Sequence, residues 1–326
     1  MSSRWLLTGG AGYIGAHVLR ALHDAGHDVV VLDNLSTGLR RKVSEGVPFV
    51  EASILDTDAV TVALRDHRID GVIHLAAKKA VGESVARPHY YFEQNVLGMM
   101  SLLEAVAAAK VHRFVLSSSA AVYGSPEGEL ITEDAPTLPL NPYGQTKLAQ
   151  EWLLRDASDA GGELSWTALR YFNVAGAGAD DLGDTGVFNL IPMALRALDQ
   201  HQAPQVFGTD YPTADGSCVR DYIHVQDLAQ AHVSAVARTE QPQRRDVFNV
   251  GRGVGFSVLE VLDAVRTAMG TEFAHEVTAR RAGDPARLVA AVDRIERELG
   301  WAASRDLTAM VSSAWSAWQA YPPAQD

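Results

Sequence analysis

Short apolar runs alternate with stretches of helical periodicity through the first half of the chain. Six runs predict buried strands, at residues 5–7, 29–33, 49–50, 72–75, 114–116 and 166–169. Between them apolar residues recur three or four positions apart, as Ile14, Val18 and Leu22 do, which is typical of amphipathic helices. Strands that alternate with helices form a parallel sheet with helices on both faces. We therefore expect a doubly wound α/β fold.

The regular alternation of apolar runs and helical patterns ends near residue 173. Glycine-rich polar stretches such as 176–178 and 180–184 follow, and they suit the loops of a domain that covers a substrate. We expect a first domain at residues 1–172 and a smaller C-terminal α/β substrate domain at residues 173–326. Segments around residues 220–236 are expected to pack back on the first domain.

Two long helices are predicted, over residues 88–109 and 143–160. The first carries more apolar surface than a single sheet contact requires. The apolar residues concerned are Val96, Met99, Met100, Leu103 and Val106. This pattern predicts a homodimer built from two helices of each subunit, and a core-facing helix in a monomer remains the alternative.

Composition excludes several classes of protein. The 326 residues are 47% hydrophobic and 21% charged, and no apolar run approaches the roughly 18 residues that a membrane span needs. The N-terminus runs into the first strand without a signal-peptide pattern, so we expect a cytoplasmic protein. A net charge of −12 argues against nucleic acid as a partner. The single Cys218 can form neither an intrachain disulfide nor a metal-binding cysteine pair, and no metal is expected.

A glycine-rich turn follows the first predicted strand and opens a helix. Gly10, Gly12 and Gly15 have the spacing of a Rossmann-type dinucleotide cradle, in which backbone N–H groups approach the pyrophosphate. Asp33 ends the second strand 18 residues after Gly15. Its carboxylate can accept hydrogen bonds from the adenosine ribose and would repel the 2′-phosphate of NADP, and no arginine directly follows it. NAD is therefore the predicted cofactor.

Tyr143 and Lys147 lie four residues apart, on one face of the helix that begins after Pro142. A nearby ammonium group and a positive nicotinamide ring favour the phenolate form of a tyrosine, which can then act as a base. The fifth strand leads into Ser119 at the carboxyl edge of the sheet, where such sheets bind ligands. Its hydroxyl can relay a proton to the phenol. Ser119, Tyr143 and Lys147 are thus the candidate catalytic residues.

Together these motifs resemble the extended short-chain dehydrogenase/reductase family. Further blocks are similar to those of its UDP-glucose 4-epimerases, at residues 33–35, 79–84, 117–124, 170–173 and 219–225. The resemblance spans most of the chain. It implies tightly held NAD, oxidation at C4 of UDP-glucose or UDP-galactose, rotation of the 4-keto sugar and return of the hydride to its opposite face. It also implies that Tyr143 takes the proton of the 4-hydroxyl.

By position, the resemblance implies two sets of binding residues. The residues that would contact NAD are Gly9, Gly12, Tyr13, Ile14, Gly15, Asp33, Asn34, Leu35, Ser53, Ile54, Leu75, Ala76, Ala77, Lys79, Asn95, Ser119, Tyr143, Lys147 and Phe172. The residues that would contact the UDP-sugar are Lys79, Ser119, Tyr143, Asn173, Asn189, Leu190, Phe207, Arg220, Arg281, Asp284 and Leu288. Phe207 would lie near uracil, and the two arginines would neutralise the diphosphate.

Several positions depart from the pattern of this family, among them Val174, which stands where some members carry proline. Ser53 replaces an aspartate near the adenine amine, which weakens or alters that contact, and Lys78 replaces an apolar residue. Leu288 stands where relatives carry Tyr, Cys or Ser as a gate on sugar size. Because leucine is intermediate in bulk, an epimerase that acts on UDP-N-acetylhexosamines, alone or in addition, remains open.

Two other functions are weighed against this interpretation. A nucleotide-sugar 4,6-dehydratase would need an acidic pair after the serine, where this chain has Ala120 and Ala121. A catalytically idle NAD-binding module is disfavoured by the intact Ser119, Tyr143 and Lys147.

Overall fold

The computed structural model describes residues 3–161, 163–281 and 284–323. The chain forms two compact units, each with a hydrophobic core of its own, and passes between them several times. The first unit contains Met1–Gly124, Thr137–Arg170 and Ala229–Phe248. The second unit contains Ser125–Pro136, Tyr171–Leu228 and Asn249–Asp326.

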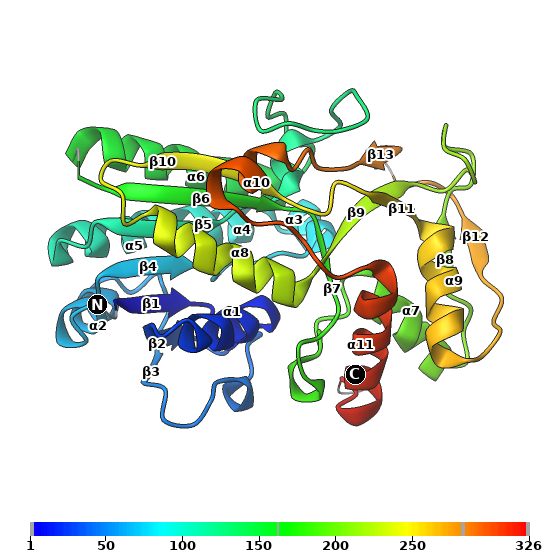
Figure 1. Ribbon diagram of the computed structural model, residues 1–326, viewed down its shortest axis with the longest axis horizontal. Coiled ribbons are helices and arrows are strands. Elements are labelled where there is room, and N and C mark those ends of the chain that lie inside the picture. The colour runs from blue at the N-terminus through cyan, green and yellow to red at the C-terminus, as the bar shows by residue number, and fades with distance from the viewer. Residues whose placement is uncertain (1–2, 162, 282–283, 324–326) are drawn as a thin grey trace. The chain divides into compact units, whose positions relative to one another are not determined.

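A seven-stranded sheet forms the centre of the first unit (Figure 1). Its strands, in spatial order, are β10 (Arg245–Val250), β6 (Ser165–Tyr171), β5 (Arg113–Ser117), β4 (Gly71–His74), β1 (Arg4–Thr8), β2 (Asp28–Asp33) and β3 (Phe49–Glu51). The five neighbouring pairs from β6 to β3 are parallel, and all six predicted strands are present. The chain builds outward from β1 to β3 and then returns to the other side of β1 at β4. Sheets of this kind bind ligands at that switch point.

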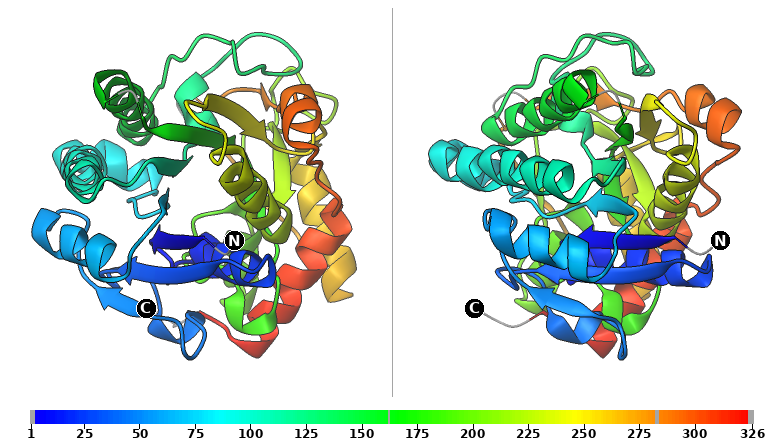
Figure 2. Two further views of the ribbon diagram at one scale, coloured as in Figure 1. Left: turned by 60° about the vertical axis from the view of Figure 1, so that its left-hand side comes forward. Right: turned by 90° about the vertical axis from the view of Figure 1, so that its left-hand side faces the viewer.

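Helices cover both faces of this sheet, so the expected Rossmann-type doubly wound fold is confirmed (Figure 2). One face carries α2 (Thr57–Asp66), α5 (Gly98–Ala109) and α6 (Pro142–Gly161), and the other carries α1 (Tyr13–Asp24) and α8 (Val225–Arg238). The shorter helical segments are η1 (Arg40–Lys42), α3 (Val81–Ala86), α4 (Pro88–Tyr91), η2 (Phe92–Leu97) and η3 (Ala120–Tyr123). In the part of the chain that the structure describes, no helix is long and apolar enough to cross a membrane.

The helix expected over residues 88–109 is present as a continuous run of α4, the π-helix η2 and α5. Met99 and Val106 are buried in the core cluster that also contains residues of α2, whereas Leu97 and Met100 are exposed. The apolar residues of this helix are therefore divided between the core and the exposed surface. The helical period turns Met99 and Val106 toward the core and leaves Met100 on the outside.

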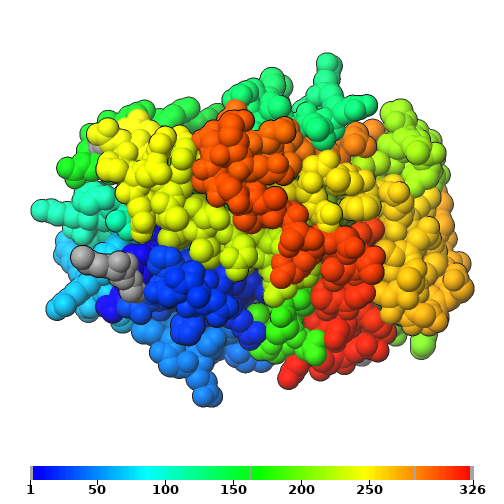
Figure 3. Space-filling model, in the orientation of Figure 1, coloured from blue at the N-terminus to red at the C-terminus, as the bar shows by residue number. Residues whose placement is uncertain are grey.

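The second unit has more regular structure than its glycine-rich sequence predicts. Its strands are β7 (Asn173–Ala175), β8 (Gln205–Phe207), β9 (Val219–His224), β11 (Gly255–Ser257), β12 (Glu276–Thr278) and β13 (Arg287–Leu288). Its helices are η4 (Asp180–Leu182), α7 (Leu190–Asp199), α9 (Val258–Met269), α10 (Asp293–Leu299) and α11 (Leu307–Ala320). β9 pairs with β7, β11 and β13, and β8 pairs with β12. α9 packs against α11, and the two lie side by side at the surface in Figure 3.

One close packing contact in the first unit can be tested directly. Trp5 on β1 lies opposite Gly71 on β4, and a Cβ added to Gly71 would come within 2.3 Å of the Trp5 ring. Trp5 is fully buried, so the ring has no free space into which to move. We expect Gly71→Ala to lower the free energy of unfolding by about 1–3 kcal/mol, measured by chemical denaturation.

Gly82→Ala in α3 is the matched control, because a Cβ added there meets no atom within 4 Å. The same substitution at an open helical position should leave the free energy of unfolding unchanged or raise it by up to about 1 kcal/mol. Equal unfolding free energies for the parent and Gly71→Ala would contradict the packing argument.

Candidate active site

The turn after β1 brings Gly12 and Gly15 close to the carbonyl oxygen of Gly9. A Cβ on Gly15 would lie 2.1 Å from the Gly9 oxygen, and one on Gly12 would lie 3.2 Å from it. Gly9 has a φ of +74°, and a Cβ there would lie 2.7 Å from the backbone nitrogen of Ala76. Gly12 precedes α1 and has no capping side chain, so the N-terminal N–H groups of α1 face outward for a phosphate. The turn therefore fits the pyrophosphate of a dinucleotide.

Asp33 ends β2 at the same edge of the sheet. Its Oδ2 accepts a hydrogen bond from the Ala11 N–H at 3.0 Å, and its Oδ1 accepts one from the Leu35 N–H at 2.8 Å. Burial raises the pKa of Asp33, while these N–H groups and the nearby Lys78 ammonium act in the opposite direction. Lys78 Nζ donates to Ser36 Oγ at 3.1 Å, so the unusual lysine lies beside the predicted ribose site.

Asn95 connects the loop after β4 to α6. Its side-chain amide donates to the Lys78 carbonyl and to Thr146 Oγ1, both at 3.0 Å, and accepts from the Lys78 N–H at 2.8 Å. Asn95 is fully buried and its side chain is already bonded, so its predicted contact with NAD stays a prediction. Lys79 Nζ lies 5.9 Å from the centre of the Tyr13 ring, which brings these two candidates together.

The other cofactor candidates of the first unit follow the ends of three strands of the sheet or begin α1. They are Ile14 in α1, Asn34 and Leu35 after β2, Ser53 and Ile54 after β3, and Leu75, Ala76 and Ala77 after β4. Ser53 Oγ accepts from the Leu55 N–H at 3.2 Å, which engages its hydroxyl within the turn. Phe172 lies between β6 and β7 and belongs to the second unit.

The three candidate catalytic residues are buried and connected at the end of β5. A hydrogen bond joins Tyr143 to Ser119, and Lys147 Nζ donates to the Ser117 carbonyl at 2.9 Å. Burial raises the pKa of the Tyr143 phenol, and the bond with Ser119 lowers it. Burial also lowers the pKa of Lys147 to about 8, against the effect of the Glu151 carboxylate. Lys147 therefore remains largely cationic at neutral pH.

Sequence reasoning missed the charged group that supports this arrangement. Glu151 lies one helical turn after Lys147 and accepts from Arg170 Nε at 2.9 Å and from Arg170 Nη2 at 2.6 Å. Both side chains are less than a tenth exposed. The Ser118 hydroxyl also donates to Glu151, and Arg170 Nη1 donates to the Tyr123 hydroxyl at 3.0 Å. An acid placed four residues after Lys147 was the signal available in the sequence.

In the second unit, four of the predicted UDP-binding side chains form two pairs. Arg220 on β9 makes an ion pair with Asp284 and is itself buried. The Arg281 guanidinium lies 3.8 Å from the centre of the Phe207 ring. The Asp284 N–H donates to the Arg281 carbonyl at 3.2 Å, which connects the two pairs. Both guanidinium groups also act electrostatically on Cys218, so the two cations lie in one region of the unit, as suits recognition of a diphosphate.

The remaining substrate candidates of the second unit lie on elements next to these pairs. Asn173 on β7 lies opposite Tyr222 on β9, and their side chains are hydrogen-bonded. Asn189 precedes α7 and donates to Asp184 at 2.9 Å, and Leu190 is the first residue of α7. Leu288 is half-buried on β13, in register with Arg220.

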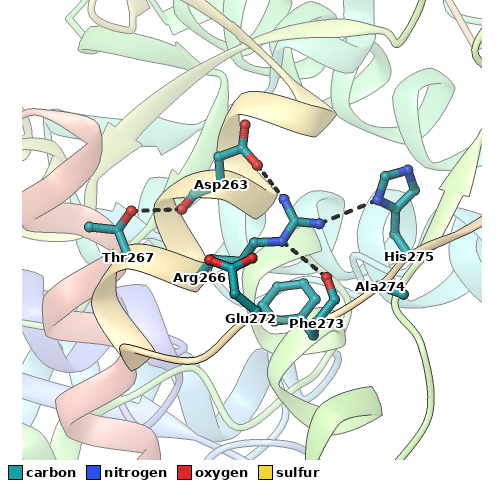
Figure 4. A pocket seen from close by; sticks show the side chains of 7 residues that line it. All are labelled: Asp263, Arg266, Thr267, Glu272, Phe273, Ala274 and His275. Atoms are coloured by element: carbon teal, nitrogen blue, oxygen red, sulfur yellow. Dashed lines mark hydrogen bonds and ion pairs between the residues drawn. The ribbon is translucent and has the colours of Figure 1, made fainter.

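A hollow of about 600 Å³ beside α9 contains none of the predicted site residues (Figure 4). Arg266 is the central cation there, and it is already paired with Asp263. Arg266 also donates to the Phe273 carbonyl at 3.1 Å and lies 3.3 Å from His275 Nδ1. Because its donors are engaged within the hollow, Arg266 is not organised to receive an anion.

Comparison with known proteins identifies the family. The model of the NAD dependent epimerase/dehydratase family matches residues 5–251. The UDP-glucose 4-epimerase of Azospirillum brasilense is 47% identical over 322 residues, which cover 97% of this chain and 92% of that protein.

Two solved structures are similar over nearly the whole chain. UDP-glucose 4-epimerase from Stenotrophomonas maltophila, with bound NAD and formylated UDP-arabinopyranose, has a TM-score of 0.92 and 41% identity, and the match covers 98% of each chain. UDP-glucose 4-epimerase from Bifidobacterium longum, in complex with NAD+ and UDP, has a TM-score of 0.92 and 37% identity, covering 98% of this chain and 99% of that one. The resemblance inferred from the sequence and the prediction of NAD as cofactor are both confirmed. The chain belongs to the NAD dependent epimerase/dehydratase family.

Proposed function

We propose that this enzyme interconverts UDP-glucose and UDP-galactose by inverting carbon 4 of the hexose. The observation that carries the proposal is the hydrogen bond between Tyr143 and Ser119, with the buried Lys147 bonded two residues away at Ser117. These groups lie at the sheet edge that also carries the glycine turn. The similarity to the UDP-glucose 4-epimerases of A. brasilense and S. maltophila supports the same activity.

The side chains supply proton transfer, and the bound NAD supplies acceptance and return of the hydride at carbon 4. The Tyr143 phenolate takes the proton of the sugar 4-hydroxyl and later gives it back. Ser119 Oγ accepts from the Ala121 N–H at 3.1 Å, which leaves the serine proton for Tyr143 or the sugar oxygen. Since burial raises the pKa of Tyr143, positive charge from Lys147 is needed to favour the phenolate. Inversion results when the 4-keto sugar turns over before the hydride returns.

We assign binding of the UDP group to the second unit. Arg220 and Arg281 would contact the diphosphate, Phe207 would lie near uracil, and Asp284 would accept from a ribose or sugar hydroxyl. A chain with a net charge of −12 needs fixed local cations to bind a dianion. Asp284 and Phe207 hold the two guanidinium groups in place, so little side-chain entropy is lost when the ligand binds.

Two alternative activities are considered, a 4,6-dehydratase and an epimerase of N-acetylated UDP-sugars. A 4,6-dehydratase remains disfavoured, because Ala120 and Ala121 in η3 provide no acid for a leaving hydroxyl. Activity on N-acetylated sugars remains a second candidate. A UDP-Glc/GlcNAc 4-epimerase from Campylobacter jejuni is 37% identical, with a TM-score of 0.87, so similar scaffolds accept both sugars. Leu288 lies next to Arg220 across the strand pair, and we assign to it the discrimination between UDP-sugars with and without an N-acetyl group.

We also propose a homodimer formed through η2, α5 and α6, which contact one another. Large apolar side chains are exposed on all three helices. Phe92 is 40% exposed, Leu97 and Met100 are each 50% exposed, and Trp152 is 49% exposed. Burial of these side chains against a second copy would remove them from water.

The protein is further proposed to act in the cytoplasm. Its one cysteine, Cys218, is buried and free. Exported proteins commonly rely on disulfides, which a single cysteine cannot form within the chain.

Tyr143→Phe is expected to lower kcat for UDP-galactose by roughly 10²- to 10⁴-fold, because the proton carrier is lost while the ring remains. Quantification of both epimers from UDP-galactose measures this, and the NAD content after denaturation should match the parent. Activity within a few-fold of the parent would assign proton transfer to another group.

Leu288→Ser should raise kcat/KM for UDP-N-acetylgalactosamine relative to UDP-galactose, because an acetamido group that displaces a packed side chain costs about 1–3 kcal/mol. The parent should prefer UDP-galactose and show weak N-acetyl activity. An unchanged ratio of the two kcat/KM values in the variant would show that Leu288 does not gate the sugar.

Light scattering at micromolar concentration should give a mass near 70 kDa, twice the 35.1 kDa of the chain. Trp152→Glu should shift the mass toward the monomer by placing a charge in the proposed interface. Val277→Glu is the control, since Val277 is also about half exposed but lies on β12 of the second unit. A parent mass near 35 kDa, or a dimer that tolerates Trp152→Glu, would refute this interface.

A further inference from the structure

Tyr211 in the second unit has a buried hydroxyl group that no described residue bonds. The side chain is only 6% exposed, and its hydroxyl has no hydrogen-bond partner among the residues that the structure describes. Leaving such a group unpaired costs stability, so native proteins retain few of them. An unpaired donor at a binding site has an evident use, because a ligand can supply the missing acceptor.

The position of this ring is fixed from several sides. The Arg280 guanidinium lies 4.1 Å from the ring centre and is itself held by Asp210, with Arg280 Nε 2.6 Å from Asp210 Oδ1. A Cβ on Gly208 would come within 3.0 Å of the Tyr211 ring and 2.5 Å of the Arg280 side chain. The Tyr211 N–H donates to the Gly216 carbonyl at 2.8 Å. The ring that carries the hydroxyl is therefore held in place by its neighbours.

The Tyr211 phenol interacts electrostatically with Arg220 and Asp284, two of the groups assigned above to the UDP-sugar, and its ring contacts Arg280, which precedes Arg281. Burial and the Asp284 carboxylate raise the pKa of Tyr211, with Cys218 acting in the same direction and Arg280 and Arg220 acting against them. The phenol thus stays protonated at neutral pH and is a hydrogen-bond donor. Arg220 and Asp284 already bond each other, so neither occupies the Tyr211 hydroxyl.

We propose that Tyr211 is a further substrate-binding residue, whose hydroxyl donates a hydrogen bond to the diphosphate of the UDP-sugar beside Arg220. This rests on the proposed function, in which Arg220 and Arg281 bind that diphosphate. The anionic oxygens are strong acceptors, and a bond to a charged group is stronger than one between neutral groups. Tyr211 is thereby a binding residue that acts on affinity and takes no part in proton transfer.

The other four unpartnered buried atoms of the described residues offer no comparable site. They belong to Gln150, Trp166, Thr167 and Arg252, none of which is among the residues assigned to the UDP-sugar.

Tyr211→Phe tests the proposal in the NAD-bound protein, with affinity for UDP measured by titration calorimetry. The variant should raise the Kd for UDP by about 10-fold or more, which corresponds to one lost hydrogen bond to a charged group. The Kd for uridine, which lacks phosphate, should remain unchanged. The kcat with saturating UDP-galactose should fall less than two-fold, since Tyr143 and Ser119 are intact.

Thermal unfolding separates a binding role from a structural one. Without UDP, Tyr211→Phe should melt at or above the melting temperature of the parent, because an unpaired buried hydroxyl is removed. The rise in melting temperature on adding UDP should be smaller than in the parent. Tyr321→Phe, at a residue that is 49% exposed, is the matched control and should leave the Kd for UDP unchanged.

Several results would overturn the proposal. An unchanged Kd for UDP would show that the Tyr211 hydroxyl does not contact the ligand. An equal loss of affinity for UDP and uridine would show that it contacts the nucleoside and not the diphosphate. A lower melting temperature without UDP would show that the hydroxyl is bonded within the folded chain. Failure of the parent itself to bind UDP would instead contradict the proposed function, and the inference with it.

Discussion

The buried ion pair between Glu151 and Arg170 is the constraint on which the catalytic geometry depends. It joins α6, which carries Tyr143 and Lys147, to the end of β6, and through the Ser118 hydroxyl it also holds the end of β5. Breaking a buried pair by removing one partner typically costs about 3–5 kcal/mol, because the other charge is left unpaired. The phenol and the serine hydroxyl that meet at this point are therefore held in a fixed relation before any ligand binds.

In the second unit, the groups proposed to bind UDP are held in a similar way. Arg220 is oriented by Asp284, and Arg281 is oriented by the Phe207 ring. Each arrangement holds a guanidinium group in place while leaving donors for an anion. Tyr211, with its unpaired hydroxyl, extends this pattern from charged to neutral donors. In both units the proposed functional side chains are oriented before a ligand binds. Such pre-orientation commonly lowers the stability of the folded protein.

The alternation of strands and helices made the first sheet predictable, because each parallel strand is buried and each covering helix has an apolar face. The seventh strand, β10, was missed, since its neighbour β6 lies far earlier in the chain and no local pattern records that pairing. The sequence also left open which apolar residues of α5 face the core. Met99 faces the core and Met100 faces outward, which depends on how α5 is rotated against the core.

The glycine turn, the acid at the end of β2 and the four-residue spacing of Tyr143 and Lys147 could be read from the chain alone, because each depends on short spacings along one strand or helix. The groups that support them could be identified only in the folded protein. Glu151 meets Arg170 across 19 positions, and Arg220 meets Asp284 across 64. Contacts between residues so far apart arise from the packing of whole elements, and the spacing along a strand or helix carries no information about them.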